Sequence, residues 1–398
     1  MFTPCPTERS RAIADRVESF VRKVVAPYER DPRYGAHGPS ADLVDELRAK
    51  AREAGVMTPH ILDDGSHLTQ LETAAVLKRS GLSPLGPVAV NTMAPDEGNM
   101  FLLGKVATPE QKRRFLDQLV SGATRSAFFM TEPAEDGGAG SDPSMLQTTA
   151  VKRGDEWVIN GRKMFITGAE GASVGIVMAR TGEDGKVQST MFLVDLPDPA
   201  IRIERVLDTI DNSMPGGHAL IVIDNLRVPA SQVLGEINEG FRYAQVRLSP
   251  ARLSHCMRWH GCATRAHEIA TAYATTRKAF GKLLIDHEGV GFMLAENLID
   301  LQQAALMIDW CAGVLDGGAV GTNESSMTKV AVSEAVFRVA DRCVQIMGGS
   351  GVSRDSIVEQ VFREVRAFRI YDGPTEVHKW SLAKMIKRKT LSGEASHG

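Results

Sequence analysis

A carboxylate stands near the C-terminal end of the sequence, just before a segment with helical periodicity. Asp372 precedes a Gly-Pro turn, and Pro374 and Glu376 are both favourable residues for the first turn of the helix that follows. A carboxylate at the mouth of a helical core can act as a general base that removes a proton from a bound molecule. The structural alternative is that Asp372 only caps the helix, because Asp is common at helix starts.

Two segments in the middle of the chain carry groups that suit a nucleotide. The loop at 134–142 contains three glycines and Ser141, and its backbone N–H groups can cradle a pyrophosphate, although such loops are also plain connectors. The run KMFIT at 163–167 alternates an aromatic ring with a hydroxyl group, which suits stacking on one planar ring. The same alternation is typical of a half-buried strand.

The composition favours an ordinary enzyme and disfavours a protein that binds nucleic acid. The 398 residues include 46 basic and 49 acidic side chains, with a formal net charge of -3 and no basic block. The odd number of cysteines without C-x-x-C spacing indicates neither a disulfide framework nor a metal site, so a reducing cytoplasm fits best. No apolar signal segment and no uncharged stretch of about 18 residues occurs, so we expect no membrane span.

The elements that must position these groups begin with a predicted helical domain, residues 1–124. Apolar residues at helical spacing predict helices at 9–25, 41–54, 68–79 and 109–120. A predicted β-domain follows at 125–236. There, Asn160-Gly161 between two β-prone runs predicts a hairpin turn, the runs 175–181 and 190–196 predict a second hairpin around 182–186, and 218–224 predicts another strand.

Helical periodicity returns after Gly240 and defines a third predicted domain, residues 237–398. Predicted helices cover 241–275, 287–315, 324–347, 356–368 and 374–387, and 393–398 is expected to be a disordered tail. Long amphipathic helices with short glycine-containing connections are typical of an antiparallel bundle. The predicted fold class is therefore mainly α with a central β-domain.

Six segments follow one another at characteristic spacing along nearly the whole chain. They are MTEP (130–133) with AGSD (139–142), KMFIT (163–167), DNLRVP (224–229) with LGE (234–236), RKAFGK (277–282), QIMGGSG (345–351) and YDG (371–373). Together they resemble the acyl-CoA dehydrogenase family. The resemblance implies the fold of that family, with an N-terminal helical domain, a β-domain and a C-terminal four-helix bundle, and it implies FAD as the cofactor.

The resemblance also implies where the cofactor and the substrate bind. Thr167 would hydrogen-bond flavin N(5), Phe165 replaces the Trp that is common in the family, and Ser141 would reach the pyrophosphate or the thioester. Other positions matched to FAD contacts are Phe128, Met130, Thr131, Ile166, Arg277, Phe280, His287, Glu288, Gln345, Ile346, Gly348, Gly349, Pro374 and Glu376, and positions matched to the substrate are Ser141, Arg252, Tyr371 and Gly373.

Some of these FAD contacts reach a neighbouring subunit in the family. They are the contacts from 277–288 and from 345–349, so the resemblance implies a homodimer or a homotetramer. Structural alternatives exist for both segments, because Arg277 can complement a helix dipole and Gly348-Gly349 can be an ordinary helix C-cap.

The chemistry of the family requires a base that removes an α-proton while a hydride leaves the β-carbon for the flavin. The family usually has Glu at the position of Asp372, and some members supply Glu at the position of Ala251, which cannot serve here. Asp372 is therefore the candidate base at the matched positions. Its side chain is one methylene shorter, about 1.5 Å less reach, and a displacement near 1 Å can cost about a hundredfold in rate.

This departure resembles one subgroup, whose larger members carry a kinase-like phosphotransferase domain beside the dehydrogenase domain. The stretches SPARLSHCMR (249–258) and YDGPTEVH (371–378) carry that resemblance, and NTMAPDEGNM (91–100) would line the acyl side. We expect no segment long enough for the partner domain within the sequence. The insertion at Glu135–Gly137 lengthens the glycine-rich loop, and its acids would repel CoA phosphates.

Three functions from different classes remain open. The first is a dehydrogenase of acyl-CoA or carrier-protein thioesters in fatty acid metabolism, which passes electrons to an electron-transferring flavoprotein or a similar acceptor. The second is a flavin oxidase of the same fold, because a nitroalkane-oxidising relative also uses Asp as its base. The third is a flavin-binding protein without catalysis, and the near-neutral charge disfavours a nucleic-acid-binding form of it.

Overall fold

The computed structural model describes residues 7–182 and 188–392, which fall into two compact units. The bundle unit comprises 1–18, 68–84 and 252–398, and the sheet unit comprises 19–67 and 85–251. Two helices, α1 (Glu8–Phe20) and α8 (Gly240–Ala274), continue from one unit into the other.

The sheet unit contains several helices that precede the strands of the sheet. They are α2 (Ala41–Glu53), α4 (Gly86–Ala89), α5 (Asp96–Val106), α6 (Pro109–Gln111) and α7 (Asp117–Val120), with π-helical turns at Val21–Val25 and Lys112–Leu116 and a short ribbon of β1 (Tyr34–Gly35) and β2 (Gly38–Pro39). Two of these helices, α4 and α5, were not predicted. Ser40 begins α2 by accepting a hydrogen bond from the backbone N–H of Leu43 at 3.3 Å. The predicted helices at 9–25, 41–54 and 109–120 are thus confirmed, with a π-helical turn in two of them.

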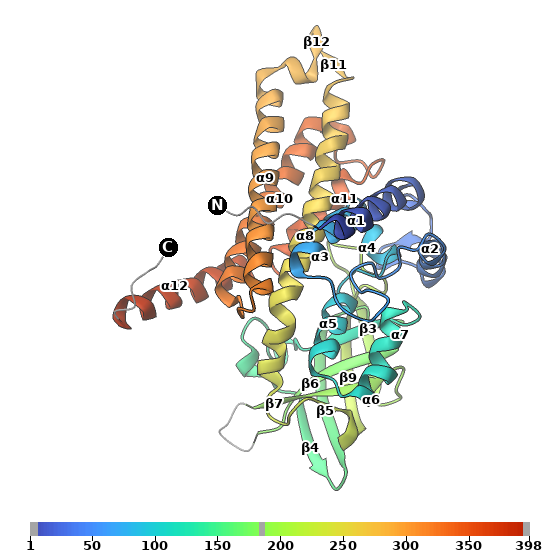
Figure 1. Cartoon of the computed structure of the whole chain (residues 1–398), viewed down its shortest axis with the longest axis vertical. Helices are drawn as coiled ribbons and strands as arrows, with labels where there is room; N and C mark the ends of the chain where they lie inside the picture. Colours follow the sequence, from blue (N-terminus) through green and yellow to red (C-terminus); the bar gives the residue numbers. More distant parts are fainter. Residues whose placement is uncertain (1–6, 183–187, 393–398) are drawn as a thin grey trace. The chain divides into compact units, whose positions relative to one another are not determined.

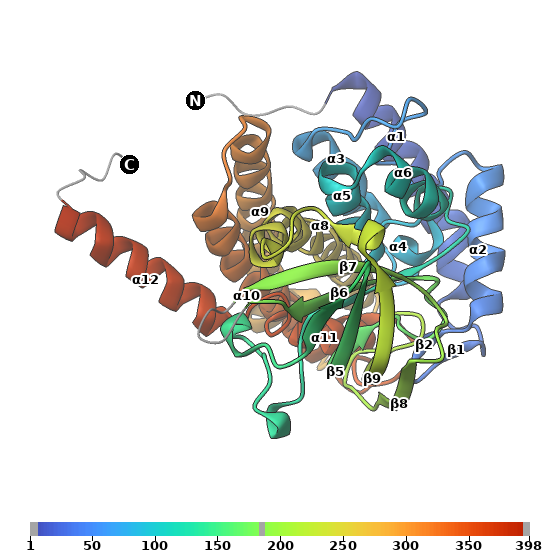
Figure 2. The ribbon, with the colours of Figure 1, turned by 90° about the horizontal axis from the view of Figure 1, so that it is seen from below.

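One sheet with eight of the described strands lies in this unit. Its strands are β3 (Ser126–Phe129), β4 (Thr149–Arg153), β5 (Glu156–Thr167), β6 (Val174–Arg180), β7 (Ser189–Asp195), β8 (Ile201–Leu207), β9 (His218–Pro229) and β10 (Val233–Leu234). They are ordered β10-β7-β6-β4-β5-β9-β8, and β3 pairs in parallel with β6. Figure 2 shows β5, β9 and β8 side by side at one end of this order.

Both faces of β6 are buried, and alternate residues of this strand enter different cores. On β6, Ile176 and Met178 pack with residues of α5 and the start of α8, whereas Val177 and Ala179 pack in a core that includes Trp157 of β5. This is the period-two alternation expected of a strand that is covered on both sides. The sheet is consequently a firm base for side chains at its surface.

The predicted hairpin turn at Asn160-Gly161 is wrong. β5 runs through both residues as one strand, and the turn between β4 and β5 lies at Gly154-Asp155. Gly161 is required for another reason, because a Cβ at this position would lie 2.5 Å from Oγ1 of Thr148. The register of β5 with β9 also shifts between Ile159 and Gly161. The glycine therefore marks a bulge at which β5 closely approaches the segment that carries Thr148.

The second predicted hairpin is confirmed. β6 and β7 pair as antiparallel strands from Val174 opposite Asp195 to Arg180 opposite Ser189. Most of the predicted turn, residues 183–186, lies outside the described residues. The predicted strand at 218–224 is confirmed as the first part of β9.

The bundle unit consists of helices, a short hairpin and the segments that connect them. The helices are α3 (Gln70–Ser80), α9 (Glu288–Asp316), α10 (Thr322–Met347), α11 (Val358–Phe368) and α12 (Thr375–Ser392), together with the parts of α1 and α8 that belong to this unit, and the hairpin is β11 (Lys278–Ala279) with β12 (Lys282–Leu283). Figure 1 shows α8 and α9 running side by side to the hairpin at their shared end. The five helices predicted after Gly240 are confirmed, and the expected tail at 393–398 lies outside the described residues.

Polar contacts between helices fix the bundle. Asp300 on α9 is paired with Arg338 and with Arg342 on α10, in the latter case at 2.7 Å, and Nε2 of His260 on α8 lies 3.1 Å from the carbonyl of Leu301. Among the described residues, α9 is the one helix long and apolar enough to cross a membrane by length and composition. Helices buried in ordinary bundles pass the same test, and the ion pairs of α9 with α10 are those of a bundle helix.

Candidate active site

Asp372 lies in a turn between α11 and α12 whose backbone is held from several sides. Its φ is +54°, a left-handed conformation that is uncommon for residues other than glycine and persists only where the surroundings impose it. Nε of Arg252 donates to the carbonyl of Asp372 at 2.9 Å, and Nζ of Lys329 donates to the carbonyl of Gly373 at 2.8 Å. Nε2 of His378 lies 3.2 Å from the same Asp372 carbonyl. Side chains of α8, α10 and α12 thus fix the turn.

The carboxylate of Asp372 faces a histidine of α8. Nε2 of His255 lies 3.3 Å from Oδ2 of Asp372, and a guanidinium nitrogen of Arg258 lies 3.1 Å from Nδ1 of the same ring. Because a guanidinium offers only donors, Nδ1 of His255 must accept, and the ring proton must be on Nε2, directed at the carboxylate. The side chain of Asp372 is 22 % exposed, although its Oδ2 is itself buried.

Aromatic rings hold His255 in this orientation. The ring of Tyr371 is centred 4.9 Å from the ring of His255, and the ring of Phe368 is centred 5.9 Å away. The hydroxyl of Tyr371 accepts a hydrogen bond from Nε1 of Trp259, one turn farther along α8. The predicted substrate residue Tyr371 therefore also positions the histidine that contacts Asp372.

Three basic groups with shifted pKa values surround the turn. Burial lowers the pKa of Lys329 to about 8, and burial lowers the pKa of Arg252, with Asp372 opposing the shift. Burial, together with the positive charges of Arg252 and Lys329, lowers the pKa of His378 to about 4, so His378 is neutral at pH 7. Cations and imidazole N–H groups of this kind favour a carboxylate in its charged, proton-accepting form.

Two predicted cofactor residues follow the turn. Pro374 directly precedes α12, one residue earlier than a first helical position, and Glu376 is exposed on its first turn. Thr375 donates to Oε1 of Glu334 at 2.8 Å, and Arg369 donates to the same oxygen at 2.9 Å. Glu334 of α10 therefore fastens both ends of the turn.

The segments that the resemblance assigns to the flavin meet in the sheet unit. The backbone N–H of Met164 donates to the carbonyl of Thr131 at 2.9 Å, and the hydroxyl of Thr131 donates back to the carbonyl of Met164 at 2.5 Å. Phe128, Met130 and Thr131 are half-buried, as is Thr167 on β5. The structure thus brings these predicted cofactor residues side by side.

Phe165 presents its ring to the outside of the sheet. Its side chain is 56 % exposed and its φ is +59°, and the register of β5 with β9 shifts between Lys163 and Ile166. A bulge re-aims a side chain, and an aromatic ring held outward in a strained backbone conformation suits a planar ligand. The residues present therefore fit a flavin ring. Ile166 is buried in the core, so only its backbone is available to a cofactor.

A buried ion pair joins the two segments that the resemblance assigns to the flavin. Nζ of Lys163 lies 2.9 Å from Oε1 of Glu132 and donates to the carbonyl of Met130 at 3.0 Å. Burial lowers the pKa of Lys163 to about 8, while Glu132 opposes the shift. Burial acts to raise the pKa of Glu132, but the charge of Lys163 and hydrogen bonds from Gln147 and Thr148 outweigh it, so the pKa lies below its ordinary value.

The glycine-rich loop is anchored to the same glutamate. The backbone N–H of Glu132 donates to the carbonyl of Ala139 at 2.8 Å, and Ser141 at the end of the loop is exposed. The insertion is folded back on the sheet, because Asp136 is paired with Arg162 at 2.9 Å and Glu135 lies 3.9 Å from the same side chain. Arg162 thus offsets part of the negative charge that the insertion introduces.

Buried side chains of the segment at 91–100 form hydrogen bonds within the sheet unit. The amide nitrogen of Asn91 donates to Oγ1 of Thr58 at 2.9 Å, and Oδ1 of Asp96 accepts from the backbone N–H of Ser126 at 2.6 Å. Both side chains are buried. They serve the packing of the helices on the sheet.

The remaining predicted cofactor residues lie at two places in the bundle unit. Arg277 and Glu288 flank the β11–β12 hairpin and are exposed, Phe280 at its tip is 96 % exposed, and Nε2 of His287 lies 3.0 Å from the carbonyl of Ala279. Gln345, Gly348 and Gly349 are exposed at the end of α10, whereas Ile346 is buried. In Figure 1 the hairpin lies at the opposite end of α9 from the start of α12.

Comparison with known proteins agrees with this arrangement. Family models for the acyl-CoA dehydrogenase N-terminal, middle and C-terminal domains match residues 7–123, 127–222 and 238–387. FadE2 of Mycobacterium tuberculosis, described as a probable acyl-CoA dehydrogenase, is 37% identical over 89% of this chain and 87% of its own length. The chain belongs to the acyl-CoA dehydrogenase family.

Two further relatives show how far the similarity to this family extends. Acyl-CoA dehydrogenase family member 11 of Gallus gallus is 34% identical over 96% of this chain, which spans about half (52%) of that longer protein. A candidate acyl-CoA dehydrogenase from Mycobacterium abscessus has a solved structure with a TM-score of 0.88 and 34% identity, covering 97% of this chain and 100% of that one. The acyl-CoA dehydrogenase fold therefore accounts for nearly the whole chain.

Three residues at the Asp372 turn were missed as functional candidates in the sequence, namely His255, Lys329 and His378. His255 follows Arg252 by three residues, which places the two on one face of a helix, so helical spacing was an available signal. Lys329 is a fully buried lysine in α10, which the sequence indicates only as a charge among small and apolar residues. His378 gave no signal beyond its place one turn after Pro374.

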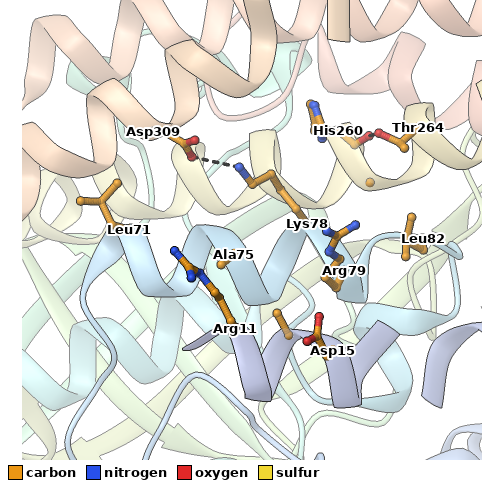
Figure 3. Close-up of a pocket in the computed structure, with 12 residues that line it drawn as sticks. Arg11, Asp15, Leu71, Ala75, Lys78, Arg79, Leu82, His260, Thr264 and Asp309 are labelled. Atoms are coloured by element: carbon orange, nitrogen blue, oxygen red, sulfur yellow. Dashed lines mark hydrogen bonds and ion pairs between the residues drawn. The ribbon is translucent and has the colours of Figure 1, made fainter. Parts of the chain in front are cut away.

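A separate hollow of about 480 Å³ lies in the bundle unit (Figure 3). Its lining comes from α1, α3, α8 and α9 and includes Arg11, Asp15, Lys78, Arg79, His260 and Asp309. Lys78 is paired with Asp309 at 2.9 Å, and burial lowers the pKa of His260 to about 4. No residue assigned to substrate or cofactor lines it, and its mixed, paired charges do not suit an acyl chain.

Proposed function

We propose that this chain catalyses the FAD-dependent α,β-dehydrogenation of an acyl-CoA thioester, with Asp372 as the base that removes the α-proton. The observation that carries the proposal is the Asp372 turn. Its carboxylate faces His255 at 3.3 Å, while Arg252 and Lys329 hold the backbone carbonyls of Asp372 and Gly373. A base must be positioned before its protonation state matters, and these contacts support Asp372 in that role.

FAD is the cofactor, and the exposed face of the sheet unit provides its proposed site. Phe165 would stack on the flavin, Thr167 would contact N(5), and Phe128, Met130 and Thr131 would lie along the pyrimidine edge. Ser141 would reach the pyrophosphate or the thioester, and Arg252, Tyr371 and Gly373 would contact the substrate. The chemistry that FAD supplies when bound is acceptance of the hydride that leaves the β-carbon.

The backbone conformation and the neighbours of Asp372 would compensate for its shorter side chain. Ala251 offers no carboxylate, so Asp372 is the proposed base without an alternative at the other family position. The left-handed φ of Asp372 and the contact with His255 at 3.3 Å would aim the shorter acid at the substrate. The subgroup with a phosphotransferase domain is the proposed branch, in line with the similarity to family member 11.

We also propose a homodimer or a homotetramer. Phe280 is almost fully exposed at the hairpin tip, and α12 carries exposed Trp380, Ile386 and Leu391 and extends away from α10 in Figures 1 and 2. Exposed aromatic and aliphatic side chains of this kind are typical of subunit contacts. Arg277, Phe280, His287, Glu288 and the segment 345–349 would then reach the FAD of a neighbouring subunit.

The proposed electron acceptor is an electron-transferring flavoprotein or a similar protein. The described cysteines, at positions 256, 262, 311 and 343, are buried thiols outside any disulfide, which suits a reducing compartment, and we propose the cytoplasm. An oxidase acting on a small acidic carbon is the second candidate, favoured by Asp rather than Glu at the base position. Neither nucleic acid nor a membrane is a proposed partner.

Anaerobic titration with acyl-CoA thioesters of graded chain length tests the proposal. A dehydrogenase bleaches its yellow flavin with one or more of these thioesters and turns over with an artificial electron acceptor. Turnover of a nitroalkane with oxygen alone would establish the oxidase instead. Flavin that no thioester and no nitroalkane reduces would contradict both and leave a flavin-binding protein.

A further inference from the structure

Three polar side chains form a hydrogen-bonded chain behind the proposed flavin face. Oδ2 of Asp211 lies 2.9 Å from Nε2 of His218, and Nδ1 of His218 lies 2.9 Å from Oγ1 of Thr167. His218 and Thr167 are opposite one another on β9 and β5, and Asp211 precedes β9. All three belong to the sheet unit.

The donor and acceptor roles along this chain follow from the carboxylate. Burial acts to raise the pKa of Asp211, but the hydrogen bonds from His218 and Thr209 outweigh it, so the pKa lies below its ordinary value. Asp211 is therefore an anion at neutral pH and can only accept. An imidazole with a single proton carries it on Nε2, facing this carboxylate, and its Nδ1 then accepts from Thr167.

The hydroxyl of Thr167 consequently uses its single proton inside the protein. A hydroxyl has one donor and two acceptor sites, so the side of Thr167 that faces outward carries lone pairs. A group that meets Thr167 from outside is thus required to donate a hydrogen bond. Without His218, the hydroxyl is able to rotate and donate outward instead.

We propose that Asp211 and His218 orient the hydroxyl of Thr167 so that it accepts a hydrogen bond at flavin N(5), and that they thereby favour the reduced cofactor. This inference rests on the proposed contact between Thr167 and N(5). N(5) carries a proton in reduced flavin and a lone pair in oxidised flavin, so an acceptor at this position discriminates between the two. His218 and Asp211 are positioning residues in this scheme, since they act through Thr167.

The chain is not needed to hold the strands together. The β5–β9 ladder already pairs Thr167 with His218, and the backbone N–H of Gly168 donates to the carbonyl of Gly217 at 2.9 Å. Removing the imidazole should therefore leave the sheet intact. A change in flavin properties without a change in folding separates the positioning role from a structural one.

The test is the equilibrium between oxidised and reduced flavin, measured against a reference dye without any acyl substrate. Thr167→Val and His218→Leu should each lower the ratio of reduced to oxidised flavin about tenfold at a fixed potential, a shift of about 30 mV for a two-electron couple. Thr167→Ser keeps the hydroxyl and should match the parent. Asp224→Asn removes an exposed carboxylate from the same strand as His218 and should also match it.

Each other result has a definite meaning. If Thr167→Val lowers the ratio and His218→Leu does not, the orienting role of His218 is wrong while Thr167 remains at the flavin. If neither variant changes the ratio, the proposed contact of Thr167 with N(5) is wrong, and the inference falls with it. The role of Asp372 is tested separately by substrate reduction, so the two failures are distinguishable.

The tautomer of His218 provides a readout that needs no flavin chemistry. Nitrogen NMR of the labelled protein should show the proton of His218 on Nε2, and Asp211→Ala should abolish that preference and lower the flavin ratio. A parent protein with the proton on Nδ1 would overturn the proposal. This pair of measurements also covers the case in which His218→Leu does not fold.

Discussion

Nε2 of His255 lies 3.3 Å from Oδ2 of Asp372, while Nδ1 of the same ring faces Arg258. His255 is therefore expected to act as a neutral donor that orients the carboxylate. In His255→Phe the ring contacts with Tyr371 and Phe368 are retained but the N–H is lost. We expect intact FAD binding, flavin reduction about tenfold slower, and an acidic limb of the pH-rate profile moved to higher pH, because the anion loses a donor.

The matched control for that variant is His260→Phe on the same helix. His260 contacts the carbonyl of Leu301 and no residue of the turn in the described contacts. Its pH-rate profile should keep the parental shape even if its stability falls. A His255→Phe profile that coincides with the parent would show that His255 is only part of the packing.

Asp372→Asn separates catalysis from helix capping. Asn caps helices about as well as Asp, so capping alone predicts normal flavin reduction. Loss of a general base predicts a folded, yellow protein that binds the thioester but reduces its flavin about a hundredfold or more slowly in stopped-flow experiments. Asp372→Glu should keep or raise the rate if the substrate sits at the usual family depth, and should lower it if the pocket has closed around the shorter acid.

Arg277→Ala should weaken the retention of FAD. The exposed guanidinium beside the β11–β12 hairpin is proposed to make a charge-assisted hydrogen bond with the pyrophosphate of a neighbouring subunit. Losing such a bond should raise the FAD dissociation constant about tenfold to a hundredfold. Lys278→Ala, one residue farther along the same exposed hairpin, is the control. Equal FAD affinities in the two variants would show that Arg277 does not bind the cofactor and is only a charged residue near a helix end.

His378 predicts a loss of stability in mild acid. Its pKa is about 4 in the folded protein and about 6.5 for an ordinary histidine, so the unfolded chain binds more protons between these two values. The free energy of unfolding should therefore decrease as the pH falls from about 6.5 to about 4, by about 3 kcal/mol from this residue. Urea unfolding at pH 7 and pH 4.5 should show a smaller pH dependence for His378→Gln than for the parent.

The exposed apolar face of α12 predicts that the protein is an oligomer. Trp380 is 62 % exposed. We expect sedimentation of the flavin-saturated parent as a dimer or tetramer, and a smaller species for Trp380→Glu, because a charge buried in a subunit contact is costly. Lys387→Glu changes an exposed charge on the same helix and should leave the assembly unchanged. A flavin-saturated monomeric parent would contradict the proposed assembly.

Long segments with a clear hydrophobic periodicity were predictable from the sequence. The 35-residue helix α8 continues through Pro250 as its apolar pattern indicates, although proline usually interrupts a helix. The turn at Asn160-Gly161 was misread because a local signal for a turn competed with a tertiary requirement, the close approach of Thr148 to a glycine. Local patterns do not carry that information.

The candidate site was predictable at Asp372 but not in its surroundings. The position of Asp372 follows from its motif, whereas the contact with His255 joins residues more than a hundred positions apart. Lys329 reaches the turn from α10 and His378 from α12, so their roles depend on how helices pack. Helical spacing places His255 on the same face as Arg252, and it does not show which carboxylate that face meets.

The buried pair of Glu132 and Lys163 limits how the proposed flavin face of this protein can be redesigned. Exchanging either residue alone leaves an uncompensated charge in the core, which typically costs about 3–5 kcal/mol, whereas replacing both with apolar residues of similar volume is often tolerated. Glu132 also receives hydrogen bonds from Gln147 and Thr148, so the glycine-rich loop depends on the same pair. The two strands and the loop therefore depend on the same ion pair. A library of single substitutions at Glu132 or Lys163 should yield only destabilised variants, and stable ones require both residues to change together.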